Sequence, residues 1–278
     1  MNRLNKYILT ILTIIGVISC KKGSLNAPEA SFMIANPSVT ITNSSIQGSN
    51  SHKITDMWLY VNDQFQGCYS VGKPMPIVAS GSATIKLFAG IKNNGIADTR
   101  QPYFFYKPVA FTQNVEAGKT YTIAPSFEYL SSTNFLFADN FDAGASHFQP
   151  LGDSLFVINS NDAYGGTGKS VFMSMSDAKP TAEMITSSYF YVPLSSAAVY
   201  LEMNYKCNQE INIGIISNNE NRRALTLNPS SDWNKIYVDL RTVINTLPAS
   251  PACKFYISAT KNTAYPLIYI DNVKVITE

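Results

Sequence analysis

The sequence has few charged residues and almost no histidine. Asp, Glu, Lys and Arg make up 14% of the chain, and His52 and His147 are its two histidines. It contains no HExxH or CxxC metal pattern, and two histidines so far apart suggest no Ser-His-Asp set. We therefore expect a protein that is not an enzyme, although the paired carboxylates of a glycoside hydrolase need no histidine and stay open.

The sequence also lacks an excess of charge of one sign. Once the first 19 residues are set aside, which contain Arg3 and Lys6, 19 basic and 19 acidic residues remain. Nucleic-acid binding depends on basic groups that displace counterions from the phosphates. A neutral chain gives no such surface, so we expect no nucleic-acid partner.

Long apolar runs are missing too, apart from one at the start of the chain. It extends from Tyr7 to Ile18 and follows two basic residues. A transmembrane helix needs about 20 apolar residues, so this run is typical of an export signal. The run ends in GVISC at residues 16–20. This ending resembles a bacterial lipobox, in which the cysteine after a small residue is lipidated.

The start of the chain therefore predicts a lipoprotein with a signal peptide at residues 1–19, lipidation at Cys20 and a linker at residues 20–28. An ordinary signal peptide or an uncleaved anchor is the alternative, but no Ala-x-Ala-like cleavage site is present. We expect a cell-envelope protein tied by acyl chains to the outer membrane. Surface lipoproteins of Bacteroidota often carry an acidic cluster where this chain has Lys21 and Lys22, so the face of the membrane stays open.

Cysteine is scarce. Beyond Cys20 the chain has Cys68, Cys207 and Cys253, an odd number that cannot all pair. Cys207 and Cys253 could form a disulfide in an oxidising envelope. The alternative is that all three are buried thiols that act as small apolar side chains.

What the chain does have is aromatic residues, with 16 Tyr and 15 Phe, and many short runs that alternate apolar and polar residues. Turn residues separate these runs, for example Asn62-Asp63 in an expected hairpin. This pattern predicts an all-β protein with two β-sandwich domains in tandem. The first would cover residues 29–130 and the second, after a join at 131–135, residues 136–278.

The first domain resembles the PEGA-type and fibronectin-like modules common in Bacteroidota lipoproteins. The features that match are Val61-Asn62-Asp63, Gly67, a turn flanked by Pro74 and Pro76, and a strand at residues 81–85. The resemblance implies a β-sandwich that serves as a spacer or docking domain.

The second domain resembles the galactose-binding-like jelly roll of many carbohydrate-binding modules. Four motifs occur in the expected order: Phe141-Asp142 on a first strand, a Gly-rich loop ending at residues 167–170, a strand from Trp233 to Leu240, and a last strand with Tyr269 to Val273. The resemblance implies a structural calcium at the edge of the sandwich. Its carboxylate ligands would be Asp142 and Asp271, and both could equally be turn acids with no metal.

The Gly-rich loop, NDAYGGTGKS at residues 161–170, also invites comparison with a phosphate-binding loop. The first glycine of a Walker A motif would stand at residue 163, which is Ala163. Residues 171–175 alternate with period two, which predicts a strand where a phosphate loop needs a helix. We expect a connection between strands.

Ligand-binding candidates come from the strands of the second domain. In residues 199–207 one face is apolar and the other carries Tyr200, Glu202 and Asn204; in residues 253–260 Phe255, Ile257 and Ala259 alternate with polar residues that include Tyr256. An aromatic ring with amides and carboxylates suits a sugar. The alternative is a solvated outer sheet whose tyrosines serve β-propensity alone.

Three functions stay open on this basis. The first is a non-catalytic lipoprotein that binds extracellular or periplasmic glycan through Tyr200, Glu202, Asn204 and Tyr256. The second is a structural or adhesin-like lipoprotein that contacts other outer-membrane proteins and binds no sugar. The third is a glycan-active enzyme with carboxylates that the sequence does not reveal.

Overall fold

The computed structural model describes residues 29–143, 146–192, 198–247 and 252–278. The predicted signal peptide, Cys20 and the predicted linker lie outside these residues. In the described part nearly all regular structure is strand, which confirms the predicted all-β class. None of the helices in that part has the length and apolar character needed to cross a membrane.

The N-terminal unit, residues 30–130, begins the described fold. Its elements are β1 (Ala30–Ile34), β2 (Ser38–Thr40), α2 (Ser44–Gln47), β3 (Asp56–Val61), β4 (Gln64–Ser70), β5 (Pro74–Ile77), β6 (Gly81–Lys92), η1 (Asn93–Gly95), β7 (Arg100–Pro102), β8 (Val109–Val115), β9 (Thr120–Ile123) and β10 (Ser126–Glu128).

The strands of this unit form one larger sheet and two smaller ones. The larger sheet has the order β4-β3-β6-β7, with β8 also paired to β6, and the smaller sheets are β5-β1-β9 and β10-β2. Asn62 and Asp63 both have positive φ, which lets them close the predicted β3–β4 hairpin. Alternate residues such as Phe32, Leu59 and Ile85 are buried together in one core, because successive side chains of a strand point to opposite faces.

The C-terminal unit, residues 134–278, follows after a short turn. Its elements are β11 (Asn134–Asp139), β12 (Phe148–Leu151), β13 (Phe156–Asn159), η2 (Tyr164–Gly166), β14 (Ser170–Met173), β15 (Thr181–Thr186), β16 (Phe190–Tyr191), β17 (Val199–Cys207), β18 (Ile211–Ser217), β19 (Glu220–Leu227), β20 (Ser230–Asp239), α3 (Arg241–Ile244), β21 (Ala252–Thr260) and β22 (Ile268–Thr277). β11 thus begins two residues before the predicted domain start at 136.

Two sheets enclose the core of this unit. One, here called the inner sheet, has the order β13-β14-β22-β17-β20 with β11 also paired to β22; the other, here called the outer sheet, has the order β12-β15-β21-β18-β19 with β16 also paired to β21. Phe255, Ile257 and Ala259 point into this core, as their alternation predicts.

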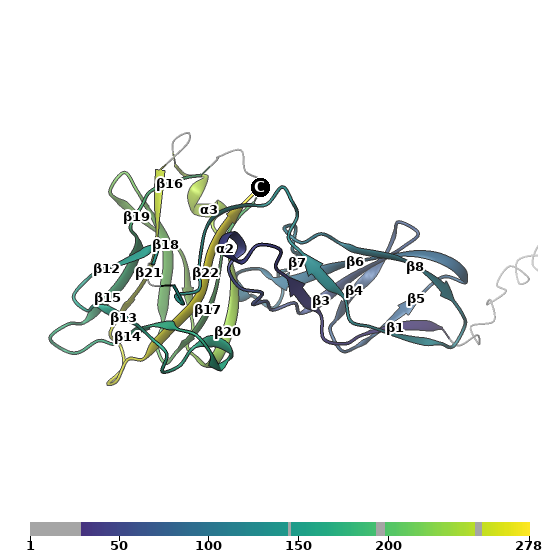
Figure 1. Cartoon of the computed structure of the whole chain (residues 1–278), viewed down its shortest axis with the longest axis horizontal. Coiled ribbons are helices and arrows are strands. Elements are labelled where there is room, and N and C mark those ends of the chain that lie inside the picture. The colour runs from purple at the N-terminus through teal and green to yellow at the C-terminus, as the bar shows by residue number, and fades with distance from the viewer. Residues whose placement is uncertain (1–28, 144–145, 193–197, 248–251) are drawn as a thin grey trace, which may run out of the picture.

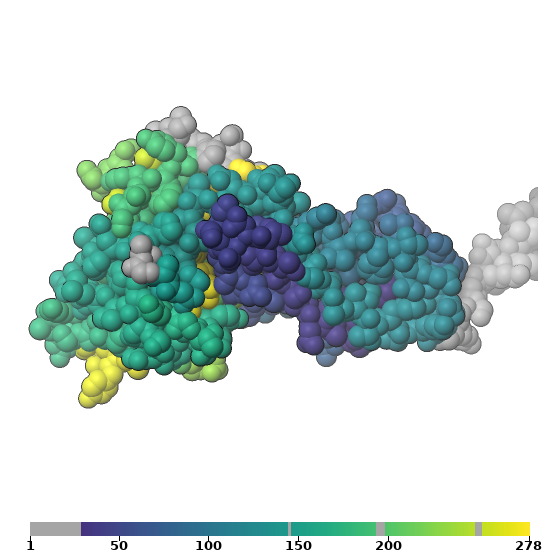
Figure 2. Space-filling model, in the orientation of Figure 1, coloured from purple at the N-terminus to yellow at the C-terminus, as the bar shows by residue number. Residues whose placement is uncertain are grey.

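The two units lie end to end, with the N-terminal unit against the inner sheet (Figure 1). Near the junction Figure 2 shows the early part of the described chain, coloured purple, in contact with the C-terminal unit. Side chains on the far side of the inner sheet complete the core of the N-terminal unit: Ala198, Tyr200, Tyr237 and Ile276. The inner sheet therefore has a core on each of its faces.

The predicted disulfide between Cys207 and Cys253 is not formed in the described part of the chain. Cys207 is the last residue of β17, and three residues separate it from the first residue of β18. Cys253 lies beside Ser217, the last residue of β18. A seven-residue strand is about 20 Å long, and a disulfide needs Cα atoms within about 7 Å. Both thiols are buried and act as small apolar groups.

Candidate functional site

The predicted ligand-binding residues of β17 lie in the interface between the two units. Tyr200, Glu202 and Asn204 are buried, and Glu202 is 0% exposed. The alternation in β17 correctly separates these residues from the core of their own unit, but the face they occupy is covered by the N-terminal unit. The expectation that they meet a glycan at an open surface is therefore wrong for this arrangement of the units.

Glu202 is the centre of a buried polar cluster in that interface. Its Oε1 accepts hydrogen bonds from Tyr103 Oη at 2.7 Å and from Tyr129 Oη at 2.9 Å. Lys235 Nζ lies 3.1 Å from its Oε2. Burial opposes the charged carboxylate, but the nearby positive charges of Lys235 and Lys274 lower the pKa of Glu202 below its usual value.

Other contacts across the interface use the remaining polar groups of the inner sheet. Lys274 Nζ donates to the carbonyl oxygens of Gln47 at 2.5 Å and Ser49 at 2.9 Å. Gln101 Nε2 donates to Tyr200 Oη at 2.6 Å, and Ser51 donates to the side-chain oxygen of Asn204. These partners satisfy many of the buried polar groups, whereas Asn204 Nδ2, Glu202 Oε2 and Lys235 Nζ have no hydrogen bond of good geometry among the described residues.

The outer sheet turns a second polar face away from the core, and Tyr256 lies on it. Tyr256 on β21 pairs with Ile185 on one side and with Gly214 on the other. Gly214 pairs in turn with Arg223 on β19. A Cβ built at Gly214 would lie 2.5 Å from Tyr256 Oη, so the phenol ring occupies the space that a side chain there would fill. Tyr256 is 2% exposed, even though it faces away from the core.

Glu183 contributes a carboxyl group to the same face of the outer sheet. It pairs with Ser258 one row from Tyr256, and Ser258 pairs in turn with Asn212. The Oε1 atom of Glu183 is shielded from solvent and has no hydrogen-bond partner among the described residues. Burial raises the pKa of Glu183. A buried oxygen without a donor is unfavourable, and a ligand hydroxyl would reach it only if neighbouring side chains move, because the atom is shielded from solvent.

Burial also raises the pKa of Tyr256, and the negative charge of Glu183 adds to this effect, while Arg223 and Asn221 lower the pKa. We call these residues the outer face, whose members share the solvent side of β15, β18, β19 and β21: Glu183, Asn212, Asn221, Arg223, Tyr256 and Ser258. It combines a carboxylate, a guanidinium, amides and hydroxyls with the ring of Tyr256, although that ring is as little exposed as Tyr200 and Glu183 Oε1 is shielded from solvent.

Of this outer face, the sequence analysis selected Tyr256 alone as a ligand candidate. The signal for Glu183 was available in TAEMIT at residues 181–186, where Ala182 and Met184 alternate with Thr181 and Glu183. This short alternation indicates which side chains of the strand share a face, but it does not show which strands lie beside it in the sheet.

The structure brings Asp142 and Asp271, the predicted calcium ligands, to one cavity of about 260 Å³. Phe141 and Asp142 lie just beyond β11 and not on it, because the side chain of Asp139 accepts from the Phe141 N–H at 2.9 Å and the chain turns there. Asp142 Oδ1 accepts from the backbone N–H of Lys169 at 2.7 Å, and Asp271 Oδ2 from that of Tyr164 at 3.0 Å.

The Gly-rich loop therefore wraps around a carboxylate. A Cβ at Gly168 would lie 2.4 Å from Asp142 Oδ1, so glycine permits this approach. The loop continues into the strand β14, as its period-two pattern predicts, and not into a helix. This confirms the expected connection between strands.

The cavity offers oxygen atoms of the kind that calcium prefers. Burial, together with the negative charge of Asp142, raises the pKa of Asp271 to about 7, and a cation would favour its charged form. The described residues contain no group of three or more His, Cys, Asp or Glu side chains that could hold a metal. Amide and backbone oxygens from the rest of the lining would have to supply further ligands, and Asn140 and Asn272 are part of that lining.

No protein-family model matches the sequence, and no curated protein matches it. Among solved structures, the chain is similar to a xylan-binding domain of the type CBM 22, with 11% identity over 53% of this chain and 97% of that one and a TM-score of 0.39. It is also similar to a CBM29-2 mutant complexed with cellulohexaose, with 14% identity, 52% and 90% coverage and a TM-score of 0.36.

A third similar structure is an exo-beta-agarase, with 13% identity and a TM-score of 0.40. The match covers 52% of this chain and 25% of the agarase. Similarity at this level does not transfer the ligands or the activity of those proteins to this chain.

Proposed function

We propose that the protein is a lipid-anchored envelope protein that binds glycan, without catalysis, at the outer face of its C-terminal unit. The observation that carries the proposal is Glu183, whose shielded Oε1 has no donor among the described residues and which lies one row from Tyr256 in the outer sheet. Sugars present hydroxyl donors next to an apolar C–H surface, and this pairing of groups matches them.

Binding without cleavage is supported by the setting of that carboxyl group. Glycoside hydrolases use two carboxyl groups about 5–9.5 Å apart. Among the outer-face residues, Glu183 is the one carboxyl group, so that face does not supply such a pair. His52 and His147 lie in different units and do not join it.

The test is a glycan array followed by titration calorimetry of the mature protein with the best ligand. Glu183→Gln should weaken binding about tenfold or more, since hydrogen bonds to charged groups contribute about 1.5–3 kcal/mol. Asp63→Asn, on the N-terminal unit, is the control and should leave affinity unchanged. Equal affinities for Glu183→Gln and the unmodified protein would contradict the proposal.

The lipid anchor is proposed from the GVISC pattern at residues 16–20. Mass spectrometry of the protein from membranes should find acyl groups on Cys20, and Cys20→Ala should release the protein from the membrane fraction. A Cys20→Ala protein that stays in the membrane would contradict an anchor at this residue.

We also propose calcium at the cavity that Asp142 and Asp271 line together. Calcium should raise the melting temperature of the mature protein, and Asp271→Asn should abolish the increase. An equal increase in Asp271→Asn would locate the ion elsewhere.

A contact with another envelope protein is the second candidate, and an aromatic cluster on the N-terminal unit favours it. Phe65 is 50% exposed and stacks on Trp58 with 5.4 Å between ring centroids; Tyr60 contacts both Phe65 and Phe88. Exposed apolar patches often mark interaction sites. A photo-crosslinker at residue 65 should give one discrete adduct in cells, and a crosslinker at Lys73, as control, should not.

A further inference from the structure

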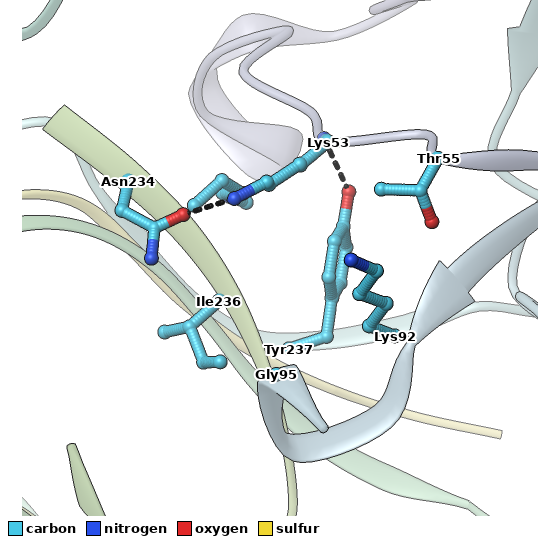
Figure 3. Close-up of a pocket in the computed structure, with 8 residues that line it drawn as sticks. Lys53, Thr55, Lys92, Gly95, Asn234, Ile236 and Tyr237 are labelled. Carbon is cyan, nitrogen blue, oxygen red and sulfur yellow. Dashed lines mark hydrogen bonds between the residues drawn. The ribbon is translucent and has the colours of Figure 1, made fainter. Parts of the chain in front are cut away.

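A small cavity lies where the two units meet, apart from the outer face and from the cavity of Asp142 and Asp271. Its volume is about 90 Å³. The N-terminal unit contributes Lys53, Lys92 and Gly95, and β20 contributes Asn234 and Tyr237 (Figure 3). Ile236 on β20 also lines it, and a Cβ at Gly95 would lie 2.8 Å from Ile236 Cδ1, so glycine permits this close approach of η1.

The lining of this cavity is positively charged. It contains three lysines, Lys53, Lys92 and Lys235, and no carboxylate. The charge of Lys235 is balanced by Glu202. Lys53 donates to the side-chain oxygen of Asn234, which is neutral. Neither Lys53 nor Lys92 forms a salt bridge with any carboxylate of the described residues.

The two unbalanced lysines also affect each other. Burial lowers the pKa of Lys53, and the positive charge of Lys92 lowers it further. Lys53 is exposed and Lys92 half-buried, so solvent screens part of the repulsion between their charges, and an anion between them would reduce what remains. The cavity has room for several water molecules or for one small anion, since a single water needs about 10–15 Å³.

We propose that this cavity binds the oxyanion of a carboxylate, sulfate or phosphate group between the two units. Lys53 and Lys92 supply the charge, and charge-assisted hydrogen bonds from ammonium groups are the strong kind. The anion contacts Lys53 and Lys92 of one unit while it rests against β20 of the other. It therefore strengthens the junction, and it stabilises the folded protein because the unfolded chain has no such site.

The experiment is titration calorimetry of the mature protein with sodium sulfate, sodium phosphate, glucuronate and glucose at matched ionic strength. Binding should saturate at one anion per chain, and glucose, which has no charge, should not bind this cavity. Binding of sulfate or phosphate identifies a free ion as the ligand, and binding of glucuronate alone identifies an acidic sugar.

Three variants decide the assignment. Lys53→Met and Lys92→Met should each weaken anion binding about tenfold, the loss expected for a hydrogen bond to a charged group. Lys73→Met, at an exposed lysine in the turn between β4 and β5, should bind as the unmodified protein does. Glu183→Gln should also keep anion binding, so failure of the proposed glycan site leaves this result intact.

Melting temperatures in sulfate serve as a second measurement. Sulfate stabilises most proteins by exclusion from their surface, so the difference between unmodified protein and Lys92→Met is the informative quantity. Loss of part of the sulfate effect in Lys92→Met supports the site. Absence of saturable binding by all three anions, or equal binding by Lys92→Met and the unmodified protein, would overturn the proposal.

Discussion

The C-terminal unit has two sheets, and the side of each that faces away from their shared core carries polar residues and tyrosines. On the inner sheet this side is buried against the N-terminal unit, where Glu202 has two tyrosine donors and a lysine partner. On the outer sheet Glu183 is half-buried, and its shielded Oε1 atom has no donor among the described residues.

The difference lies in the charges around each carboxyl group: Glu202 Oε2, like Glu183 Oε1, has no hydrogen bond of good geometry among the described residues, but it lies 3.1 Å from Lys235 Nζ. A buried charge is tolerated when it has partners, as Glu202 has. The Oε1 atom of Glu183 has no such partner among the described residues. In our proposal, a hydroxyl group of the glycan donates a hydrogen bond to it. The same alternating pattern of residues thus serves a permanent interface in one sheet and, in our proposal, a temporary one in the other.

The largest expected effect comes from removing the charge at the centre of the permanent interface. Glu202→Gln leaves Lys235 and Lys274 buried without their negative partner, and breaking such a pair costs about 3–5 kcal/mol. Urea denaturation of the mature protein should measure this loss in the free energy of unfolding. Glu220→Gln, at an exposed pair with Arg222, is the control and should cost less than about 1 kcal/mol. Similar small losses for both variants would mean that the interface does not depend on Glu202.

A smaller effect is expected from pH, because Lys274 is buried in the same interface. Burial lowers its pKa to about 7, whereas an unfolded lysine has a pKa of about 10.4. Between these pH values the unfolded chain binds more protons at this lysine, so the free energy of unfolding should rise with pH, most clearly from 8 to 9, because Asp271, with a pKa raised to about 7, contributes the opposite slope near pH 7. Glu202, Lys235 and the Tyr129 ring surround this ammonium group, and the Tyr129 pKa is raised, so the tyrosine does not titrate in this range.

Urea midpoints at pH 7, 8 and 9 measure this slope. Lys274→Met removes the titrating group and should flatten the dependence of the free energy of unfolding on pH. Lys261→Met, the control, removes a lysine that pairs with the exposed Asp177 and should leave that dependence unchanged. An unchanged slope in Lys274→Met would show that another group titrates.

The smallest effect on stability is expected at the outer face. Glu183→Gln removes a shielded charge that lacks a partner, so the free energy of unfolding at pH 7 should stay the same or rise by up to about 1 kcal/mol. The same change should weaken glycan binding about tenfold. A loss of stability near that of Glu202→Gln would mean that Glu183 has a structural role and would remove the contrast between the two faces.

Sequence patterns predicted much of the fold because they depend on local geometry. The alternation at residues 253–260 identified Phe255 and Ile257 as core residues, and Asn62-Asp63 marked a hairpin because both residues adopt positive φ. The loop at 161–170 was correctly separated from a phosphate-binding loop for the same kind of reason.

The site residues were harder to predict because alternation identifies which side chains share a face and not what covers that face. Tyr200, Glu202 and Asn204 do share a face, but a segment about a hundred residues earlier in the chain covers it, as the Gln101–Tyr200 hydrogen bond illustrates. The same limit applies to Cys207 and Cys253, whose distance depends on where β18 places its two ends.

The most direct test of the central claim is a ¹H–¹⁵N NMR titration of the mature protein with the glycan selected on the array. Signals of Tyr256, Arg223 and Asn212 should shift in proportion to occupancy, while those of Tyr200 and Glu202 should stay in place. Shifts confined to the N-terminal unit, or to β17 and β22, would contradict a glycan site on the outer face.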